Sequence, residues 1–191
     1  RTFETSIYLE GVDAKTPIGN EGSAQGVLRS ITDILTEFPD FDLRAISLTA
    51  HDGIFQGNLI IALHNMNRIL EIDHENGIAV VEPGIINAQL NKELAKEGFF
   101  FAPDPASASM CSVGGNIATN AGGLRAVCHG VTINWVRALE VVLADGRVIH
   151  VGSKTIKNVS SLNLKELFIG SEGTLAIVTK ATLKLIPLPK K

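Results

Sequence analysis

The chain has 191 residues, of which 45% are hydrophobic and 19% are charged, a composition typical of globular proteins and long enough for one sizeable domain. Its formal net charge of −3 gives no support for binding nucleic acid or an anionic membrane through a basic surface. Two cysteines are too few for a disulfide framework and lack metal-ligand spacing, so a reducing, cytoplasmic location is expected. Charged residues or asparagines interrupt every long apolar stretch, so the sequence predicts no membrane span.

Apolar periodicity and turn residues predict the first elements in chain order. An apolar stripe predicts a helix over residues 22–36, and a short apolar strand follows at 59–63. Two strands at 69–73 and 78–82 flank an Asn-Gly pair and predict a hairpin. A second helix is predicted over 86–97, because a glycine follows it where a helix C-terminus favours one.

The second half of the chain continues the same mixture. A short helix is predicted at 113–121, a hairpin from strands 138–143 and 148–151, one or two helical turns at 164–169, and a long strand over 175–186. Hairpins and helices alternate without a strand–helix–strand rhythm. The expected fold class is therefore α+β, with mainly antiparallel sheets flanked by helices.

The most informative stretch runs from Asp104 to Gly123 and combines two Gly-Gly pairs with three hydroxyl residues. Because glycine has no Cβ, a pyrophosphate or a ring can lie directly against its amide. A helix that begins there would offer free N–H groups to an anion, and Ser107, Ser112 and Thr119 would add hydroxyl donors. The alternative is a glycine-rich turn that only permits close packing. The clustering of these features favours a cofactor site.

Two further runs contain glycines at turns. Gly170 and Gly173 bracket Ser171-Glu172 before a strand, an arrangement that either reads the edge of an adenine or flavin ring or forms an ordinary hairpin. In Pro83-Gly84 the proline fixes φ and the glycine frees it, so the chain can turn sharply and aim an amide. Most such pairs are only turns.

Candidates for catalysis are few. The five histidines are scattered, without metal-ligand spacing, so we assign neither a metal site nor a catalytic residue. His129, in a glycine-rich segment, is the histidine we place nearest a cofactor, the alternative being a partly exposed loop position. The chain has no Gly-x-Ser-x-Gly elbow, Walker loop or Gly-x-Gly-x-x-Gly fingerprint, which disfavours nucleotide hydrolysis and Rossmann-type NAD binding.

Seven motifs in order resemble the FAD-binding domain of the vanillyl-alcohol oxidase type of flavoenzymes, in particular the group of glycolate oxidase flavoprotein subunits and FAD-linked D-lactate dehydrogenases. The resemblance covers roughly residues 59–189. The motifs are Met66–Leu70, Glu82–Gly84, Asp104–Ser107, Val113–Asn116, Asn120–Gly123, Leu143–Gly146 and Gly170–Leu175.

The resemblance implies a two-lobed domain that binds FAD, and the predicted elements divide into lobes 1–84 and 85–191. It also implies oxidation of a 2-hydroxy acid of the glycolate or D-lactate type, with flavin N5 accepting hydride. The residues that it assigns to the cofactor are Pro83 and Gly84 beneath the ligand, Ser107, Ser112, Gly114, Gly115 and Thr119 along pyrophosphate and flavin, Gly173 and Ile177 at the flavin–adenine side, and Pro105 and Asn116 in the same motifs.

The chain departs from the family at residues 44–58. The family has an Arg-Gly-x-Gly-Thr loop there, whose amides hold the pyrophosphate, whereas this chain retains only Arg44, Ser47 and Thr49 as remnants. Either the loop has been lost or part of it is missing from this sequence. We favour the second alternative, because losing the amides would weaken pyrophosphate binding severely.

In the family a substrate domain follows near Pro187–Pro189 and carries most substrate-binding groups. We therefore expect a fragment that is inactive alone, with the substrate domain and any partner redox subunits outside it. A flavin-free scaffold kept for interaction with partner subunits is the alternative. A sugar-nucleotide reductase that shares the FAD fold fits the Asp104-Pro105 and Ser171-Glu172 runs less well.

Overall fold

The computed structural model describes residues 5–8, 12–13, 42–51, 54–159 and 162–189, with side chains for Ile61 and from Leu63 onward. The described strands form a four-stranded, a five-stranded and a two-stranded antiparallel sheet. The predicted α+β class with antiparallel sheets is confirmed. The helix predicted over 22–36 lies outside the described residues.

The first sheet is built around strand β4 (Ile54–Ala62), which begins five residues before the predicted strand. β4 pairs antiparallel with β1 (Thr5–Tyr8), β2 (Val12–Asp13) and β3 (Asp42–His51). The described residues of 44–58 form strands and not a loop, and the cofactor roles of Arg44, Ser47 and Thr49 stay a prediction. Arg44, Ser47 and Thr49 lie within a ten-residue strand, whose pairing with β4 runs to His51 opposite Ile54.

The second sheet has five strands in the order β5-β6-β10-β8-β9, all antiparallel. Both predicted hairpins are confirmed: β5 (Ile69–Asp73) with β6 (Ile78–Val81), and β8 (Val136–Leu143) with β9 (Val148–Gly152). Each turn contains a glycine with positive φ, 58° at Gly77 and 83° at Gly146. The long β10 (Ala176–Lys184) lies between the hairpins and joins them into one sheet.

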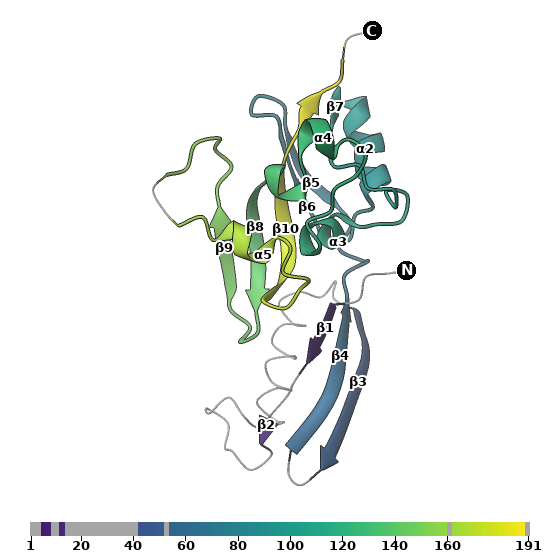
Figure 1. Cartoon of the computed structure of the whole chain (residues 1–191), viewed down its shortest axis with the longest axis vertical. Helices are drawn as coiled ribbons and strands as arrows, with labels where there is room; N and C mark the ends of the chain where they lie inside the picture. The colour runs from purple at the N-terminus through teal and green to yellow at the C-terminus, as the bar shows by residue number, and fades with distance from the viewer. Residues whose placement is uncertain (1–4, 9–11, 14–41, 52–53, 160–161, 190–191) are drawn as a thin grey trace.

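Helix α2 (Asn87–Lys96) matches the predicted helix, and Gly98 follows it with φ 78°. α3 (Val113–Ala118) is three residues shorter than predicted, and α5 (Lys165–Phe168) is one turn. Four elements were not predicted: α4 (Ala126–His129), the 3-10 helix η1 (Thr132–Asn134), and the paired strands β7 (Phe99–Phe100) and β11 (Ile186–Pro187). Figure 1 shows α2, α3 and α4 on one side of the five-stranded sheet, and α5 near β8 and β9.

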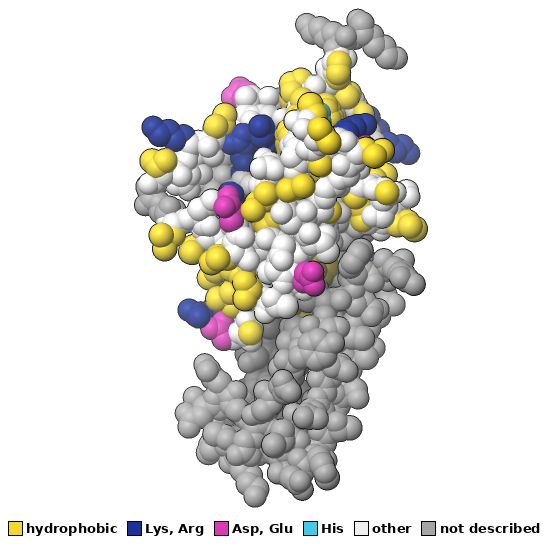
Figure 2. Space-filling model, in the orientation of Figure 1, with side chains coloured by type: hydrophobic (Ala, Val, Ile, Leu, Met, Phe, Trp, Pro, Cys, Tyr) yellow, Lys and Arg dark blue, Asp and Glu magenta, His cyan; other side chains and the backbone are white. Residues whose placement is uncertain are grey.

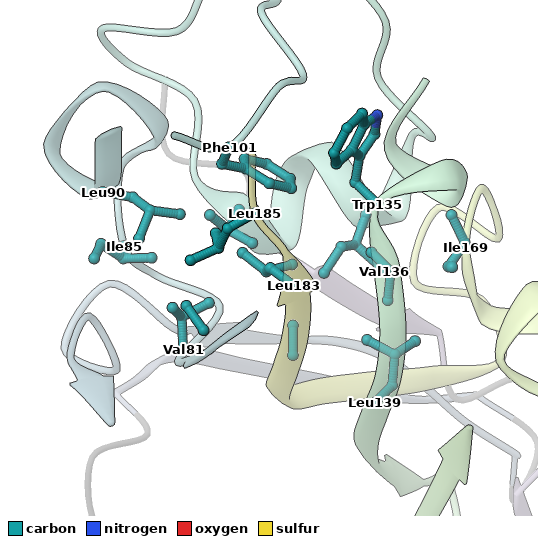
Figure 3. Close-up of a cluster of buried hydrophobic side chains, with 14 of the residues drawn as sticks. Val81, Ile85, Leu90, Phe101, Trp135, Val136, Leu139, Ile169, Leu183 and Leu185 are labelled. Carbon is teal, nitrogen blue, oxygen red and sulfur yellow. The ribbon is translucent and has the colours of Figure 1, made fainter. Parts of the chain in front are cut away.

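The core fills the space between the second sheet and its helices. Figure 3 shows Leu183 of β10 between Val81 of β6 and Val136 of β8, with Phe101 and Trp135 above them. The apolar faces of α2 and α3 complete the same cluster. Burying these side chains is the main favourable term in folding, and it holds α3 at a fixed place over the sheet.

The sheet pairing bears on the predicted lobes 1–84 and 85–191, which remain a prediction. Both β5 and β6 precede residue 84, yet they are hydrogen bonded into the sheet that contains β10. The pairing therefore favours a boundary near residue 63, after β4, over one at residue 84.

Glu140 on β8 is a buried carboxylate with three side-chain partners from neighbouring strands. Its oxygens accept hydrogen bonds from Thr179 Oγ1 at 2.8 Å and Lys180 Nζ at 2.9 Å, and lie 2.9 Å from His150 Nε2. Burial raises the pKa of Glu140, but the bonds from Lys180 and Thr179, the charge of Lys180 and the contact with His150 lower it further, to below its ordinary value.

We expect Glu140→Gln to destabilise the fold by about 1–3 kcal/mol at neutral pH, because it removes charge-assisted hydrogen bonds from a buried site. A depressed pKa stabilises the folded state above the unfolded-state pKa of about 4.3, and this stabilisation is lost as pH falls through the folded-state pKa. Chemical denaturation across pH should therefore show that the unfolding free energies of the native chain and of Glu140→Gln converge in acid. Glu75→Gln, in the exposed β5–β6 turn, is the control, and a gap independent of pH would contradict the assignment.

Candidate cofactor site

One cleft collects seven of the predicted cofactor residues from three segments that are distant in sequence. They are Pro83, Gly84, Ser112, Gly114, Gly115, Gly173 and Ile177. The loop after β4, the start of α3, the turn before β10 and the start of β10 all contribute to the lining. Motifs that were only ordered along the chain are therefore adjacent in space.

The loop beneath the cleft is fixed by a buried carboxylate. Glu82 is 2% exposed and accepts bonds from the Arg68 backbone N–H at 2.7 Å, from Nε at 3.0 Å and from Nη2 at 2.7 Å. The Glu82 N–H donates to the carbonyl of Arg68 at 3.0 Å. The Arg68 side chain is 61% exposed, but removing its hydrogen bonds would leave the buried Glu82 carboxylate without side-chain donors from Arg68, which is costly. The contact between Arg68 and Glu82 joins the motif Met66–Leu70 to the motif Glu82–Gly84.

Gly84 is required by backbone packing. A Cβ at this position would lie 2.1 Å from the carbonyl oxygen of Leu63 and 2.7 Å from that of Met66. The Gly84 N–H already donates to Met66 at 2.7 Å. This glycine therefore joins the loop after β4 to the floor of the cleft, and does not aim its amide at a ligand.

The start of α3 is also joined to this floor. The Val113 N–H donates to Ile85 at 2.9 Å and the Gly114 N–H to Pro83 at 2.7 Å. The Gly115 N–H donates to the side chain of Ser112, the N-cap, at 3.1 Å. The expectation of free N–H groups for an anion is therefore wrong, since the first three amides of this six-residue helix have protein acceptors.

The C-terminal end of α3 is hydrogen bonded to the turn before β10, which forms the opposite wall of the cleft. Its carbonyls at Ile117 and Ala118 accept from Gly170 at 2.9 Å and Glu172 at 2.8 Å. Glu172 has φ 53° and Gly173 has φ 75°, so two successive residues adopt left-handed conformations. This turn brings Gly173 to the cleft and starts β10, and the hairpin alternative for this run does not apply.

Several predicted residues lie elsewhere. Pro105, Ser107, Asn116 and Thr119 do not line the cleft. The carbonyls of Pro105 and Ser107 accept backbone bonds within their own turn. The hydroxyl of Thr119 donates to the carbonyl of Gly115 at 2.9 Å. For Arg44, Ser47 and Thr49 only the backbone position in β3 is described.

Asn116, one residue beyond the cleft, is buried at 2% exposure. Within the described part of the chain, its side-chain Nδ2 is buried without a hydrogen-bond partner. An unsatisfied buried amide costs free energy, so this position beside the cleft is suited to a contact that the protein itself does not supply.

His129 does not line the cleft. Its ring lies edge-on to Phe100 and Trp135, with centroids 6.3 and 6.0 Å away, and its carbonyl accepts from Trp135 Nε1 at 2.8 Å. The structure thus gives it a packing role. Among the described residues, no group of three or more His, Cys, Asp or Glu side chains is placed to hold a metal, and no helix could span a membrane.

Sequence reasoning missed much of the lining. The added residues are Leu63, His64, Ile86, Met110, Ala118, Phe168, Ser171, Ala176 and Val178. Ser171 lay between two glycines that were singled out, which was a usable signal. The apolar ones are indistinguishable in sequence from core residues, because a cleft wall and a core need the same side chains.

The cleft is narrow and uncharged. Its volume is about 100 Å³, below the roughly 300–1,000 Å³ of sites that enclose a whole drug-sized ligand. Among the described lining residues there is no Asp, Glu, Lys or Arg. Such a cleft is suited to one uncharged, flat part of a larger ligand.

Comparison with known proteins identifies the family to which the chain belongs. The model of the FAD binding domain matches residues 45–152, more than half of the 191 residues. The chain belongs to this family. The resemblance identified from seven motifs is thereby confirmed, and the domain is an FAD-binding one.

Curated relatives agree. The chain is 47% identical to glycolate oxidase subunit GlcD of Bacillus subtilis over 135 residues, covering 71% of this chain and 29% of that protein. It is 51% identical to a D-lactate dehydrogenase of Archaeoglobus fulgidus over 118 residues, covering 62% and 26%. The chain thus spans less than a third of the length of the curated relatives that it matches.

Solved structures give the same fold. An alkyldihydroxyacetonephosphate synthase superposes with a TM-score of 0.59 at 29% identity, covering 67% of this chain and 23% of that one. A carbohydrate oxidase from Microdochium nivale superposes with a TM-score of 0.54 at 27% identity, covering 67% and 26%.

We expect Gly84→Ala to destabilise the chain by about 3 kcal/mol or more, because its Cβ would meet two carbonyl oxygens that cannot move independently. Gly98→Ala is the control. Gly98, unlike Gly84, has positive φ, but nothing lies within 4 Å of a Cβ added there, so only backbone strain of about 1 kcal/mol applies. Equal losses in thermal or chemical unfolding would contradict the packing role of Gly84.

Proposed function

We propose that this chain is the FAD-binding part of a longer flavoprotein that oxidises a 2-hydroxy acid of the glycolate or D-lactate type. The observation that carries the proposal is the convergence of seven predicted cofactor residues on one cleft in a chain of the FAD binding domain family. Relatives named glycolate oxidase, D-lactate dehydrogenase and D-2-hydroxyglutarate dehydrogenase support the substrate class.

The cleft is suited to a ring of FAD. Its walls are glycine backbone, Pro83 and the apolar side chains of Ile86, Phe168 and Ile177, and they carry no charge. A flat heterocycle gains from apolar contact with such walls, and nearby backbone groups can pair with its polar edge. The buried, unpaired amide of Asn116 supplies a further donor beside this cleft.

Oxidation requires more than the cofactor. The bound flavin supplies the hydride acceptor, and protein groups must orient the hydroxy acid and take its hydroxyl proton. The cleft offers His64 as its titratable side chain among the described lining residues, and no cation for a carboxylate. We infer that a substrate domain outside this chain, and any partner redox subunits, provide the remaining groups.

A flavin-free scaffold is the second candidate, favoured by one observation. The segment expected to hold a pyrophosphate loop forms the paired strands β3 and β4, and strand amides in a ladder are committed to their partners. An absorption spectrum of the purified chain after addition and removal of excess FAD separates the two proposals. A cytoplasmic location also remains a proposal.

We expect Gly115→Val to weaken FAD binding by about 1 kcal/mol or more, because the added side chain enters the space that a ligand would share. Gly115 is buried and lines the cleft. The measurement is a flavin fluorescence titration, with thermal unfolding without FAD to show that the variant folds. Ala88→Val, on the exposed side of α2, controls for added apolar bulk. Unchanged affinity would assign Gly115 to packing alone.

The FAD-loaded chain should not oxidise glycolate or D-lactate at a useful rate, because the groups that position the acid are outside it. Anaerobic mixing with each acid, followed by flavin absorbance, tests this expectation. Dithionite should bleach the same sample and thereby show that the bound flavin can be reduced. Rapid bleaching by millimolar acid would place the catalytic groups within these residues.

A further inference from the structure

A second cavity lies apart from the cofactor cleft and shares no lining residue with it. It is enclosed by η1, the start of β8, the end of β9, the segment after β9 and α5. Its volume is about 450 Å³, within the roughly 300–1,000 Å³ typical of small-molecule sites. This cavity lies outside the seven motifs of the family.

The lining of this cavity is cationic, although the whole chain carries a net charge of −3. Arg137, Lys165 and Lys184 line it with one acid, Glu166, which leaves two positive charges in excess. Figure 2, in the orientation of Figure 1, shows Lys and Arg side chains spread across the upper part of this face. The positive excess is that of the lining residues themselves.

The pairing of these charges identifies which cations remain for a ligand. Lys165 Nζ lies 3.2 Å from Glu166 Oε1, so this pair largely neutralises itself. Hydrogen bonds from Asn163 and Lys165 lower the pKa of Glu166, so it is ionised at neutral pH. Lys184 Nζ lies 4.8 Å from the centroid of the Trp135 ring. Within the described chain, neither Lys184 nor Arg137 has a carboxylate partner.

Arg137 gives the most specific signal. Its Nε is buried and has no hydrogen-bond partner among the described residues. A guanidinium donor withdrawn from water without an acceptor is costly, so this atom lacks the oxygen that would satisfy it. Guanidinium groups match the oxygens of carboxylates and phosphates in two-point geometry.

We propose that this cavity binds a small dianionic oxyanion, either a phosphate or a dicarboxylate, through Arg137 and Lys184. Two positive charges without carboxylate partners match two negative charges, and the volume leaves room for a body that carries them. The hydroxyls of Ser153 and Thr155, which also line the cavity, supply neutral hydrogen-bonding groups. This inference is independent of FAD binding, because the two cavities share no residue.

Calorimetric titration of the full 191-residue chain with inorganic phosphate, succinate and acetate tests the proposal. FAD is added in excess and ionic strength is held constant with chloride, so that neither the cofactor cleft nor screening supplies the signal. We expect phosphate or succinate to bind measurably and acetate to bind much more weakly. The tighter of the two dianions identifies the source of the ligand. Binding of neither, or equal binding of acetate, would overturn the proposal.

The variant Arg137→Gln should weaken binding of the preferred dianion by at least about tenfold, as expected for loss of a charge-assisted bond. Arg147→Gln, at the exposed β8–β9 turn and paired with Asp145, is the matched control and should leave affinity unchanged. Equal affinity in Arg137→Gln and the native chain would overturn the assignment.

Stability provides a second readout. In the absence of oxyanions, Arg137→Gln should unfold at the same temperature as the native chain or higher, because it removes an unpaired buried donor. Millimolar phosphate or succinate should raise the unfolding temperature of the native chain and not of the variant. If Arg137→Gln does not fold, Lys184→Gln carries the titration, and undiminished affinity there overturns the proposal.

Discussion

The described structure depends on the direct contact between the start of α3 and the segment that follows β6. The Val113 and Gly114 amides bond to the carbonyls of Ile85 and Pro83, and a Cβ on Gly114 would lie 2.7 Å from the Pro83 Cβ. No side chain fits between them. Because β6 belongs to the sheet and α3 holds the turn before β10, this one contact fixes the floor and both walls of the cleft.

This contact changes what the glycine-rich motif does. A Gly-Gly pair at a helix start normally suggests an anion site, because the first amides of a helix lack intrahelical acceptors. Here the carbonyls of Pro83 and Ile85 and the hydroxyl of Ser112 satisfy those amides. The glycines permit close backbone approach, and the cleft that results is shaped for a ring and not for a phosphate.

Much of the fold could be predicted from sequence because its signals are local. The Asn-Gly and Asp-Gly turns predicted both hairpins, and the glycine that follows residue 97 predicted the end of α2. Seven of the fourteen predicted site residues line one cleft, whereas Pro105, Ser107, Asn116 and Thr119 do not. By contrast, β3 carries a sequence that resembles a degraded loop, and its strand state depends on pairing with β4, a non-local interaction. Arg137 was not singled out from the sequence, since the burial of its Nε beside a cavity is a property of the folded chain.

The charge distribution separates two tasks within the proposed cofactor site. A pyrophosphate carries negative charges that must be met by cations or by unpaired amides. The cleft lining has no Lys or Arg among its described residues. The first amides of α3 already donate to protein acceptors. The groups that hold a pyrophosphate must therefore lie outside the described lining. Arg44 is the natural position to examine, because it sits at a register shift in β3 between Leu43 and Ala45.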